Sequence, residues 1–144
     1  MPETKDLSIS ILPCDDDDFL LVKKFISDFS LDDTQLDARQ FLIAKKNHEV
    51  IGFVRYKKYE DCAELCSLGV VENYRLKGVG SKLVRALLQK NGRPVFIVTI
   101  IPEFFTRFGF EDVPEYPESV RKKLLYCESS LSVPEKYLVM AMNS

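Results

Sequence analysis

The sequence predicts an α/β fold (α+β by some schemes), with a central mixed, twisted sheet of about six to seven strands flanked by about four helices. Two observations lead to this prediction. Apolar runs of strand length alternate along the chain with segments of helical periodicity. At the centre, a strand at Leu65–Val71 passes through a glycine-bearing turn into a helix. With 144 residues, 46% of them hydrophobic, we expect one domain, residues 1–144, around one core.

The N-terminal quarter is predicted to contain a strand and two helices. Partial alternation of apolar residues indicates a strand at Leu7–Leu12. The acidic run Asp15–Asp18 marks the beginning of a helix, because carboxylates cap the first N–H groups and oppose the positive end of the helix dipole. Apolar residues then recur at helical spacing as far as Phe29. A second, short helix is expected at Asp33–Arg39.

A β-hairpin is predicted next. The apolar runs 41–44 and 50–54 flank the polar segment 46–49, which is typical of two strands and their turn. The single histidine of the chain, His48, is then exposed at the tip and is discounted as a catalyst. Arg55 extends the second strand, where it either holds a substrate carboxylate or lies on the solvent-facing side of the sheet.

The second half of the chain returns to strands after the central helix. The β-branched run Val95–Ile100 is typical of a buried, largely parallel-paired strand. Pro102 begins a short helix and Gly109 ends it. A helix at Glu118–Leu125 and a closing strand at Tyr137–Met142 complete the predicted order.

Composition and charge exclude several classes of partner. A net charge of −2, a pI near 5.5 and the lack of a basic tract argue against binding of nucleic acid. The longest apolar run, Val95–Ile101, is too short to cross a bilayer, and the N-terminus carries acids where a signal peptide has basic residues. We therefore expect a cytoplasmic protein with a small-molecule partner and no membrane partner; a homodimer is left open.

The cysteines predict neither a metal site nor a disulfide framework. Cys14, Cys62, Cys66 and Cys127 show no Cys-x-x-Cys pairing, and a zinc site would need more nitrogen or sulfur ligands at closer spacing. Cys66 lies within the central strand and is interpreted as a buried small hydrophobe. No metal is therefore expected.

The turn Arg75–Ser81 is suited to an anion. The first N–H groups of a helix have no partner inside it, and the macrodipole adds positive potential there. Gly78 and Gly80 lack a Cβ and allow a phosphate to approach the backbone closely. Positive charge around it comes from Arg75, Lys77 and Lys82. From the residues alone, a tight turn without a ligand stays open.

Two motifs resemble those of one family. Arg75-x-x-Gly78-x-Gly80 resembles the pyrophosphate-binding turn, Arg/Gln-x-x-Gly-x-Gly/Ala, of the GNAT superfamily of acyl-CoA-dependent N-acyltransferases. The segment Phe104–Phe110 resembles the end of that family's fourth helix. With the strand pattern, the resemblance covers most of the chain. It implies acetyl-CoA as cosubstrate, direct attack of a primary amine in a ternary complex, and a sheet splayed between its fourth and fifth strands.

The resemblance also assigns the cofactor contacts. Backbone groups beside the splay would bind the thioester and the pantetheine amides, and the turn would bind the pyrophosphate. The residues are Leu68, Gly69 and Val70 in the strand, Arg75, Leu76, Lys77, Gly78, Val79, Gly80 and Ser81 in the turn, and Phe105 in the fourth helix.

The chemistry calls for a base. Holding an amine neutral at pH 7 costs about 4.6 kcal/mol for a lysine-like group and about 1.4 kcal/mol for an α-amino group. Glu64 is the candidate, because its spacing to the glycines resembles that of the catalytic glutamate in histone-acetylating relatives. The alternative is a surface glutamate at the start of a strand. Many relatives protonate the leaving thiolate with a tyrosine, but Phe105 stands there, so Tyr126 is the replacement candidate.

The acceptor is the least defined part of the prediction. Within the superfamily the chain most resembles the acetyltransferase domain of N-acetylglutamate synthases, for example in the segment Pro117–Tyr126. The Thr-Thr-Arg that ends their fifth strand reads Val98-Thr99-Ile100 here, which leaves Thr99 and Arg55 as substrate-binding candidates. We expect a small, amino-acid-like amine. The alternatives are a protein lysine or N-terminus, or an acyl-CoA-binding module without catalysis.

Overall fold

The computed structural model describes residues 9–130 and 134–143. Within them, the strands form one mixed sheet in the order β1-β2-β3-β4-β5-β7-β6. The elements, in chain order, are β1 (Ser10–Pro13), α1 (Asp16–Asp28), the 3₁₀ turn η2 (Ala38–Gln40), β2 (Phe41–Lys46), β3 (Glu49–Lys58), β4 (Ala63–Val70), the 3₁₀ turn η3 (Glu72–Tyr74), α2 (Val79–Lys90), β5 (Val95–Thr99), α3 (Pro102–Thr106), β6 (Glu111–Asp112), α4 (Glu118–Ser130) and β7 (Leu138–Met142). The predicted fold class is confirmed.

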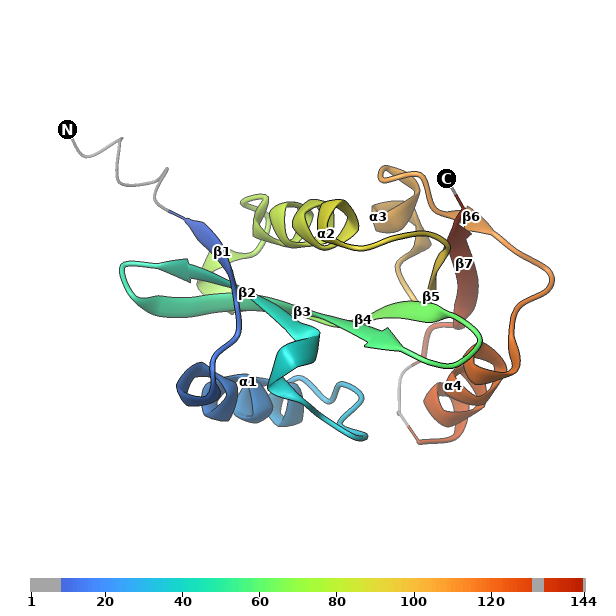
Figure 1. Cartoon of the computed structure of the whole chain (residues 1–144), viewed down its shortest axis with the longest axis horizontal. Helices are drawn as coiled ribbons and strands as arrows, with labels where there is room; N and C mark the ends of the chain where they lie inside the picture. Colours follow the sequence, from blue (N-terminus) through green and yellow to red (C-terminus); the bar gives the residue numbers. More distant parts are fainter. Residues whose placement is uncertain (1–8, 131–133, 144) are drawn as a thin grey trace. The chain divides into compact units, whose positions relative to one another are not determined.

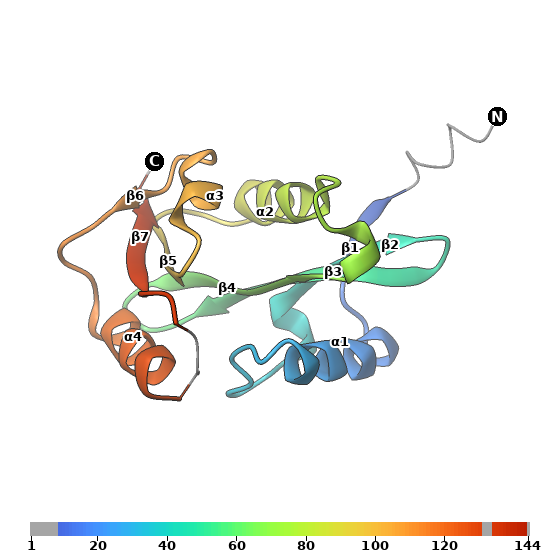
Figure 2. The same cartoon turned by 180° about the vertical axis from the view of Figure 1, so that it is seen from behind.

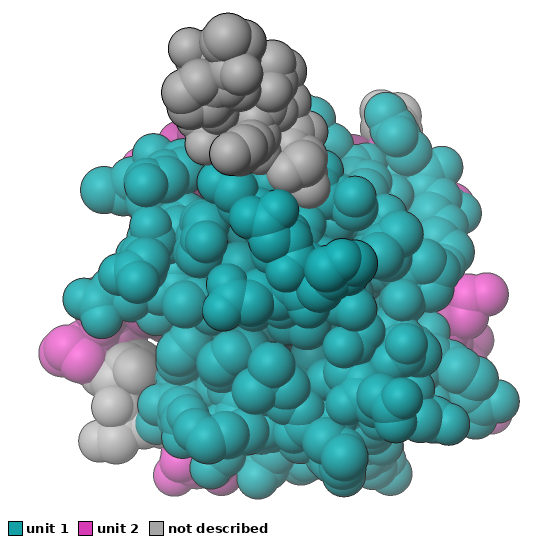
Figure 3. All heavy atoms as spheres, turned by 90° about the vertical axis from the view of Figure 1, so that its left-hand side faces the viewer, with its two compact units in different colours: residues 1–55, 67–90 teal, residues 56–66, 91–144 magenta. Residues whose placement is uncertain are grey.

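The chain divides into two compact units, coloured separately in Figure 3. Unit 1 comprises residues 1–55 and 67–90, and unit 2 comprises residues 56–66 and 91–144. Among the described residues, no helix of either unit is long and apolar enough to cross a membrane. No group of three or more His, Cys, Asp and Glu side chains in the same residues is arranged to hold a metal ion.

In unit 1, helices α1 and α2 cover opposite faces of strands β1 to β3 (Figures 1 and 2). The Asp15 carboxylate caps α1 by accepting a hydrogen bond from the Asp18 N–H at 2.8 Å, as the acidic run predicts. Val22 and Ile26 then pack one face of α1 against Phe53 and its neighbours in the sheet. Burial of this apolar face, more than helix propensity, holds α1 in place.

The other face of the sheet allows a close approach of α2 at Gly52. A Cβ at Gly52 would lie 3.1 Å from Leu83 Cδ1 and 3.2 Å from Val79 Cγ1. Such distances are shorter than ordinary van der Waals contacts. The small residue in β3 therefore fixes how closely the beginning of α2, and the turn before it, sits on the sheet.

Three phenylalanines form a stacked layer on the α1 side of unit 1. Phe25, Phe29 and Phe53 have ring centroids 5.7–6.1 Å apart and interplanar angles of 5–15°. A Cβ at Gly69 would come within 2.5 Å of Phe53 Cζ and 3.0 Å of Phe29 Cδ2. The space beside Gly69 is thus filled by the aromatic layer.

In unit 2, β5 pairs antiparallel with β7, which also pairs with β6. Helix α4 packs on β5 through a cluster centred on Phe96, Val120 and Val139. Strand β4 joins β5 in parallel, with Glu64 opposite Phe96. This parallel pair makes the sheet mixed, as predicted. The prediction that the strand at Val95–Ile100 pairs largely in parallel is wrong, because β5 is antiparallel to β7 along its whole length, Val95–Thr99, and meets β4 in parallel only at Phe96 among the described residues.

The predicted helix at Asp33–Arg39 is wrong. Helical backbone is found there only from Ala38, in η2. The reason is local, because Asp32 Oδ1 accepts the Thr34 N–H at 2.9 Å and Asp37 Oδ1 accepts the Arg39 N–H at 2.9 Å. Such aspartate turns compete with the helical bonds of the backbone.

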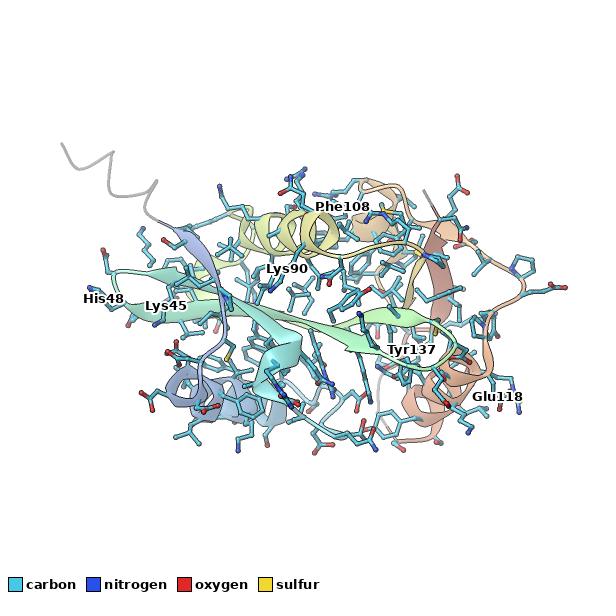
Figure 4. The ribbon with its side chains drawn as sticks, viewed as in Figure 1. Lys45, His48, Lys90, Phe108, Glu118 and Tyr137 are labelled. Carbon is cyan, nitrogen blue, oxygen red and sulfur yellow. The ribbon has the colours of Figure 1, made fainter. Side chains whose placement is uncertain are left out.

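Other boundaries differ less. Helix α4 continues to Ser130, five residues beyond its predicted end at Leu125. The first strand spans Ser10–Pro13, and residues 7 and 8 of its predicted range lie outside the described residues. Strand β6 has two residues, too few to show alternation, and was not predicted. The hairpin of β2 and β3 is confirmed, with His48 exposed at its tip (Figure 4).

Candidate functional site

The turn before α2 has the backbone that its glycines predict. Gly78 has a φ of +85° and Leu76 a φ of +64°, both in the left-handed region. The first bond of the helix runs from the Lys82 N–H to the Gly78 carbonyl at 3.1 Å, so the N–H groups of residues 79–81 have no intrahelical acceptor. A leucine in this conformation is uncommon, and the Leu76 side chain is fully exposed at 104%. Exposed strain of this kind is typical of a binding loop.

Arg75 holds this turn against the rest of unit 1. Its Nε donates to the Val70 carbonyl at 2.7 Å, and its guanidinium carbon lies 5.2 Å from the centroid of the Phe29 ring. The arginine therefore links the turn to the last residue of β4 and to the aromatic layer. Sequence reasoning assigned Arg75 to the phosphate and missed this link.

Strand β4 is irregular at its middle. Ser67 has a φ of +50°, which interrupts the regular strand backbone. Among the described residues, the parallel register of β4 with β5 consists of Glu64 opposite Phe96. The half-buried Leu68 and Val70 follow Ser67 outside that register. A distorted strand with a short parallel ladder agrees with the splay that the resemblance implied.

Glu64 is buried in unit 2 and is hydrogen-bonded on both oxygens. Its side chain is 0% exposed, so the interpretation as a surface glutamate is wrong. Lys123 Nζ of α4 donates to Oε2 at 2.7 Å, and the Tyr59 hydroxyl donates to Oε1 at 2.8 Å. A carboxylate has about four lone-pair positions, so two remain for other partners. We name these three residues the Glu64 cluster.

The other members of the Glu64 cluster were missed from the sequence. Lys123 is 8% exposed and lies on the buried face of α4 with Val120 and Cys127. A lysine at an apolar position of the helix was the signal that could have identified it. Burial, followed by the Glu64 carboxylate, raises the pKa of Tyr59 well above its usual value of 10. Tyr59 therefore serves as a hydrogen-bond donor at neutral pH.

Three further predicted site residues lie in unit 2. Phe105 is 2% exposed and packs edge-on against Phe104 and Phe110, with centroids 4.9 and 5.7 Å away. The Thr99 hydroxyl accepts the Ile101 N–H at 2.9 Å, which ends β5. Tyr126 lies half-buried on α4. The structure thus gives Phe105 and Thr99 packing and capping contacts, and the roles assigned to all three stay predictions.

Arg55 is fully buried in unit 1, so its placement on a solvent-facing side of the sheet is wrong. Its Nε donates to Gln40 Oε1 at 2.7 Å, and its Nη2 donates to the carbonyls of Thr34 and Gln35 at 2.7 and 2.9 Å. The guanidinium also lies 5.9 Å from the centroid of the Phe41 ring. Arg55 thereby joins β3 to the segment that replaces the predicted second helix.

None of the thiols has the environment of a nucleophile. Burial and the neighbouring aspartates raise the pKa of Cys14 to about 11. Burial and a hydrogen bond to Asp61 raise the pKa of Cys62 to about 12. Cys66 and Cys127 are 7% and 3% exposed. The interpretation of Cys66 as a buried hydrophobe is confirmed, and no disulfide joins any of the four.

A cavity of about 410 Å³ lies elsewhere in unit 1. Its walls come from α1, the hairpin tip and the end of β4, and include Phe25, His48 and Tyr74. None of the predicted site residues lines it.

Comparison with known proteins agrees with this fold. The profile of the acetyltransferase (GNAT) family matches residues 10–110. An uncharacterized N-acetyltransferase of Chlorobaculum tepidum is 30% identical over 111 residues, covering 72% of each chain. These matches define an acyltransferase of the N-acetyl class. The chain belongs to the GNAT acetyltransferase family, which confirms the sequence prediction.

Solved structures show the same fold. N-acetylglutamate synthase of Neisseria gonorrhoeae, in complex with coenzyme A and N-acetyl-glutamate, superposes with a TM-score of 0.75 at 18% identity, over 94% of this chain. The chain spans about a third (35%) of that synthase. A Mycobacterium tuberculosis protein solved in complex with CoA superposes with a TM-score of 0.76 at 18% identity, covering 94% of this chain and 99% of its own.

Proposed function

We propose that this protein transfers an acetyl group from acetyl-CoA to the primary amine of a small, amino-acid-like molecule, by direct attack within a ternary complex. The observation that carries this proposal is the turn Arg75–Ser81, which has left-handed backbone at Leu76 and Gly78 and leads into the N-terminus of α2. Membership of the GNAT family and the coenzyme A bound to similar folds support the choice of donor.

The turn binds the pyrophosphate of the cofactor through backbone N–H groups of residues 78–81. The free N–H groups and the helix dipole both favour an anion at this position. Lys77 and Lys82, both exposed, add positive charge around it. Arg75 acts by holding the turn on Phe29 and the Val70 carbonyl.

The backbone of β4 binds the acyl end of the cofactor. Beyond the irregularity at Ser67, the N–H groups of Leu68 and Val70 are the proposed donors to the thioester oxygen. Such donors stabilise the negative charge that develops on that oxygen when the amine attacks. Gly69 lies between them, where the rings of Phe53 and Phe29 pack against the strand.

Glu64 is the proposed base. An ammonium group of the acceptor gives up a proton to the carboxylate before its lone pair attacks the thioester carbon. Lys123 and Tyr59 hold the carboxyl group in one orientation, and the lone pairs that they leave unused are available to the acceptor. Tyr126 is retained as the candidate that protonates the leaving thiolate, since Phe105 has no proton to give.

The test of the cofactor site is binding of acetyl-CoA by calorimetry to the wild type and to Gly80→Val. Gly80 lies within α2 and has no positive φ, so valine obstructs the phosphate without straining the backbone. We expect binding to fall by at least about 100-fold, a loss that corresponds to about 2.7 kcal/mol. Gly92→Val is the matched control, because a Cβ at Gly92 meets no atom within 4 Å.

The transfer itself is tested with a panel of amines and thiol release as the readout. Release with small amines, reduced at neutral pH by Glu64→Gln, is expected. Tight cofactor binding without release for any small amine, but with release for lysine-bearing peptides, would contradict the choice of acceptor. Unchanged binding in Gly80→Val would refute the role of the turn.

A further inference from the structure

One nitrogen of Arg55 has no partner among residues 9–130 and 134–143. Nε and Nη2 make three hydrogen bonds, whereas Nη1 is buried and makes none with the described residues. Each guanidinium carries five N–H donors, so both donors on Nη1 are idle. A buried donor without an acceptor is costly, and such groups in a native fold usually have a ligand or a functional role.

Arg55 also makes no ion pair with the described residues. Its three acceptors are neutral oxygens of Gln40, Thr34 and Gln35. Its charge acts on Asp37, whose pKa falls to about 2, first through hydrogen bonds from Arg39 and last through the charge of Arg55. Asp37 is already ion-paired with Arg39 at 2.8 Å. A fully buried cation without an anion is unfavourable, and an anionic ligand would balance it.

We propose that Arg55 Nη1 binds a carboxylate of the acceptor, so that the enzyme selects amines that carry an acidic group. This inference rests on the proposed transferase function and narrows its substrate class. The guanidinium is planar and always charged, which suits it to a carboxylate better than lysine would be. The carboxylate accepts the N–H groups of Nη1, while Nε and Nη2 keep their bonds to the protein.

Segment 34–40 is bonded to the guanidinium of Arg55. The side chain is 0% exposed, and three hydrogen bonds join its Nε and Nη2 to residues of this segment. Gln35 has a φ of +51°, which is left-handed backbone in a residue that seldom adopts it. An acceptor reaches Nη1 when the segment moves aside, and the segment then forms one wall of the bound state.

The first experiment compares amino acids with their carboxamides, glutamate with glutamine and glycine with glycinamide. The quantity measured is the ratio of kcat/KM for the acid to that for the amide. We expect the wild type to favour the acids. Arg55→Gln should lower the ratio by about 10- to 100-fold, mainly through KM, since a hydrogen bond to a charged group is worth that much. Arg55→Lys should retain part of the preference.

Arg39→Gln is the matched control. Arg39 lies in the same segment, but its side chain is 89% exposed and paired with Asp37, so the acid-to-amide ratio should stay unchanged. Thermal unfolding of each variant confirms that it is folded. If Arg55→Gln is unfolded, the test uses the wild type alone. A kcat/KM for the amides within about twofold of that for the acids would then overturn the proposal.

Binding without turnover separates this inference from the proposed function. Glutamate and glutamine are titrated into the CoA complex, and amide hydrogen exchange is followed in residues 32–41. Binding of glutamate with protection of that segment, and no transfer to any amine, would sink the transferase and leave the carboxylate site standing. Transfer to neutral amines with no preference for acids, and no glutamate binding, would refute the carboxylate site and leave the transferase standing.

Discussion

Two of the buried cations, Lys123 in unit 2 and Arg55 in unit 1, have different kinds of partner. Lys123 in unit 2 donates to the Glu64 carboxylate at 2.7 Å, and the Tyr59 hydroxyl completes the cluster. Arg55 in unit 1 is more deeply buried, yet it bonds neutral oxygens and leaves Nη1 without a partner. Both charges lost their hydration on folding, but only one found an opposite charge among the described residues.

The difference distinguishes a cation with a structural role, Lys123, from a cation that we propose binds a ligand, Arg55. A buried ion pair is stable as long as both members are present, and removing one member leaves the other uncompensated. A lone buried cation already bears that cost in the folded protein. Substitution of either member of the ion pair therefore lowers the stability of the protein, whereas binding of an anion next to the lone cation raises it.

The largest expected effect comes from Lys123→Met. The change leaves the Glu64 carboxylate buried without its counterion, so the free energy of unfolding should fall by about 3–5 kcal/mol. Urea unfolding measures it. Lys122→Met, at the exposed neighbouring position of α4, is the control and should change little. The double variant Lys123→Met/Glu64→Gln should recover part of the loss; a loss equal to the sum of the two single changes would contradict the pairing.

A smaller loss is expected from Arg55→Met. No carboxylate is left behind, so the cost is that of the oxygens of Thr34, Gln35 and Gln40 losing a donor, about 1–3 kcal/mol in total. The same urea measurement applies. A loss as large as that of Lys123→Met would remove the distinction between the two cations.

The third prediction concerns pH and Tyr59. Its folded pKa lies above the unfolded value near 10, so its contribution to stability is complete below pH 10 and is lost as the pH rises above it. Between pH 10 and 11 this single group should account for at most about 1.4 kcal/mol of the fall in unfolding free energy. Tyr59→Phe should flatten the curve in that range. Parallel curves for the two proteins would show that Tyr59 is not shielded as described.

The smallest effect is expected at the surface pair Lys24–Asp28 of α1. Its side chains are 67% and 49% exposed at a separation of 2.8 Å, so water and salt screen the attraction. Lys24→Met should change the free energy of unfolding by no more than about 0.5 kcal/mol. A change of several kcal/mol would mean that burial is not what distinguishes Lys123.

The parts of the fold that depend on local pattern could be predicted from the sequence. The acidic run before α1, the two glycines before α2 and the apolar run of β5 each act on their own neighbourhood. The segment at Asp33–Arg39 failed for a reason that is equally local, because two aspartates captured backbone N–H groups that a helix would have used. Asp-rich segments between apolar runs are better predicted as turns.

Of the candidate site, only the turn Arg75–Ser81 could be predicted from the sequence. Glu64 was selected by its spacing to the glycines, but its partner Lys123 lies 59 residues further along the chain. Arg55 was singled out as a candidate, whereas its idle nitrogen depends on carbonyls 20 and 21 residues earlier. Contacts at such separations are decided by packing, and a single sequence carries no direct record of them.

The state of the thiols has a practical consequence for labelling. With the pKa of Cys14 near 11 and that of Cys62 near 12, and with Cys66 and Cys127 buried, few native thiolates are present at neutral pH. A cysteine placed by Leu76→Cys would stand fully exposed in the turn before α2. Maleimide dyes should therefore mark that position selectively. The chain has no tryptophan, so the fluorescence of a dye at residue 76 would be recorded without tryptophan emission from the protein.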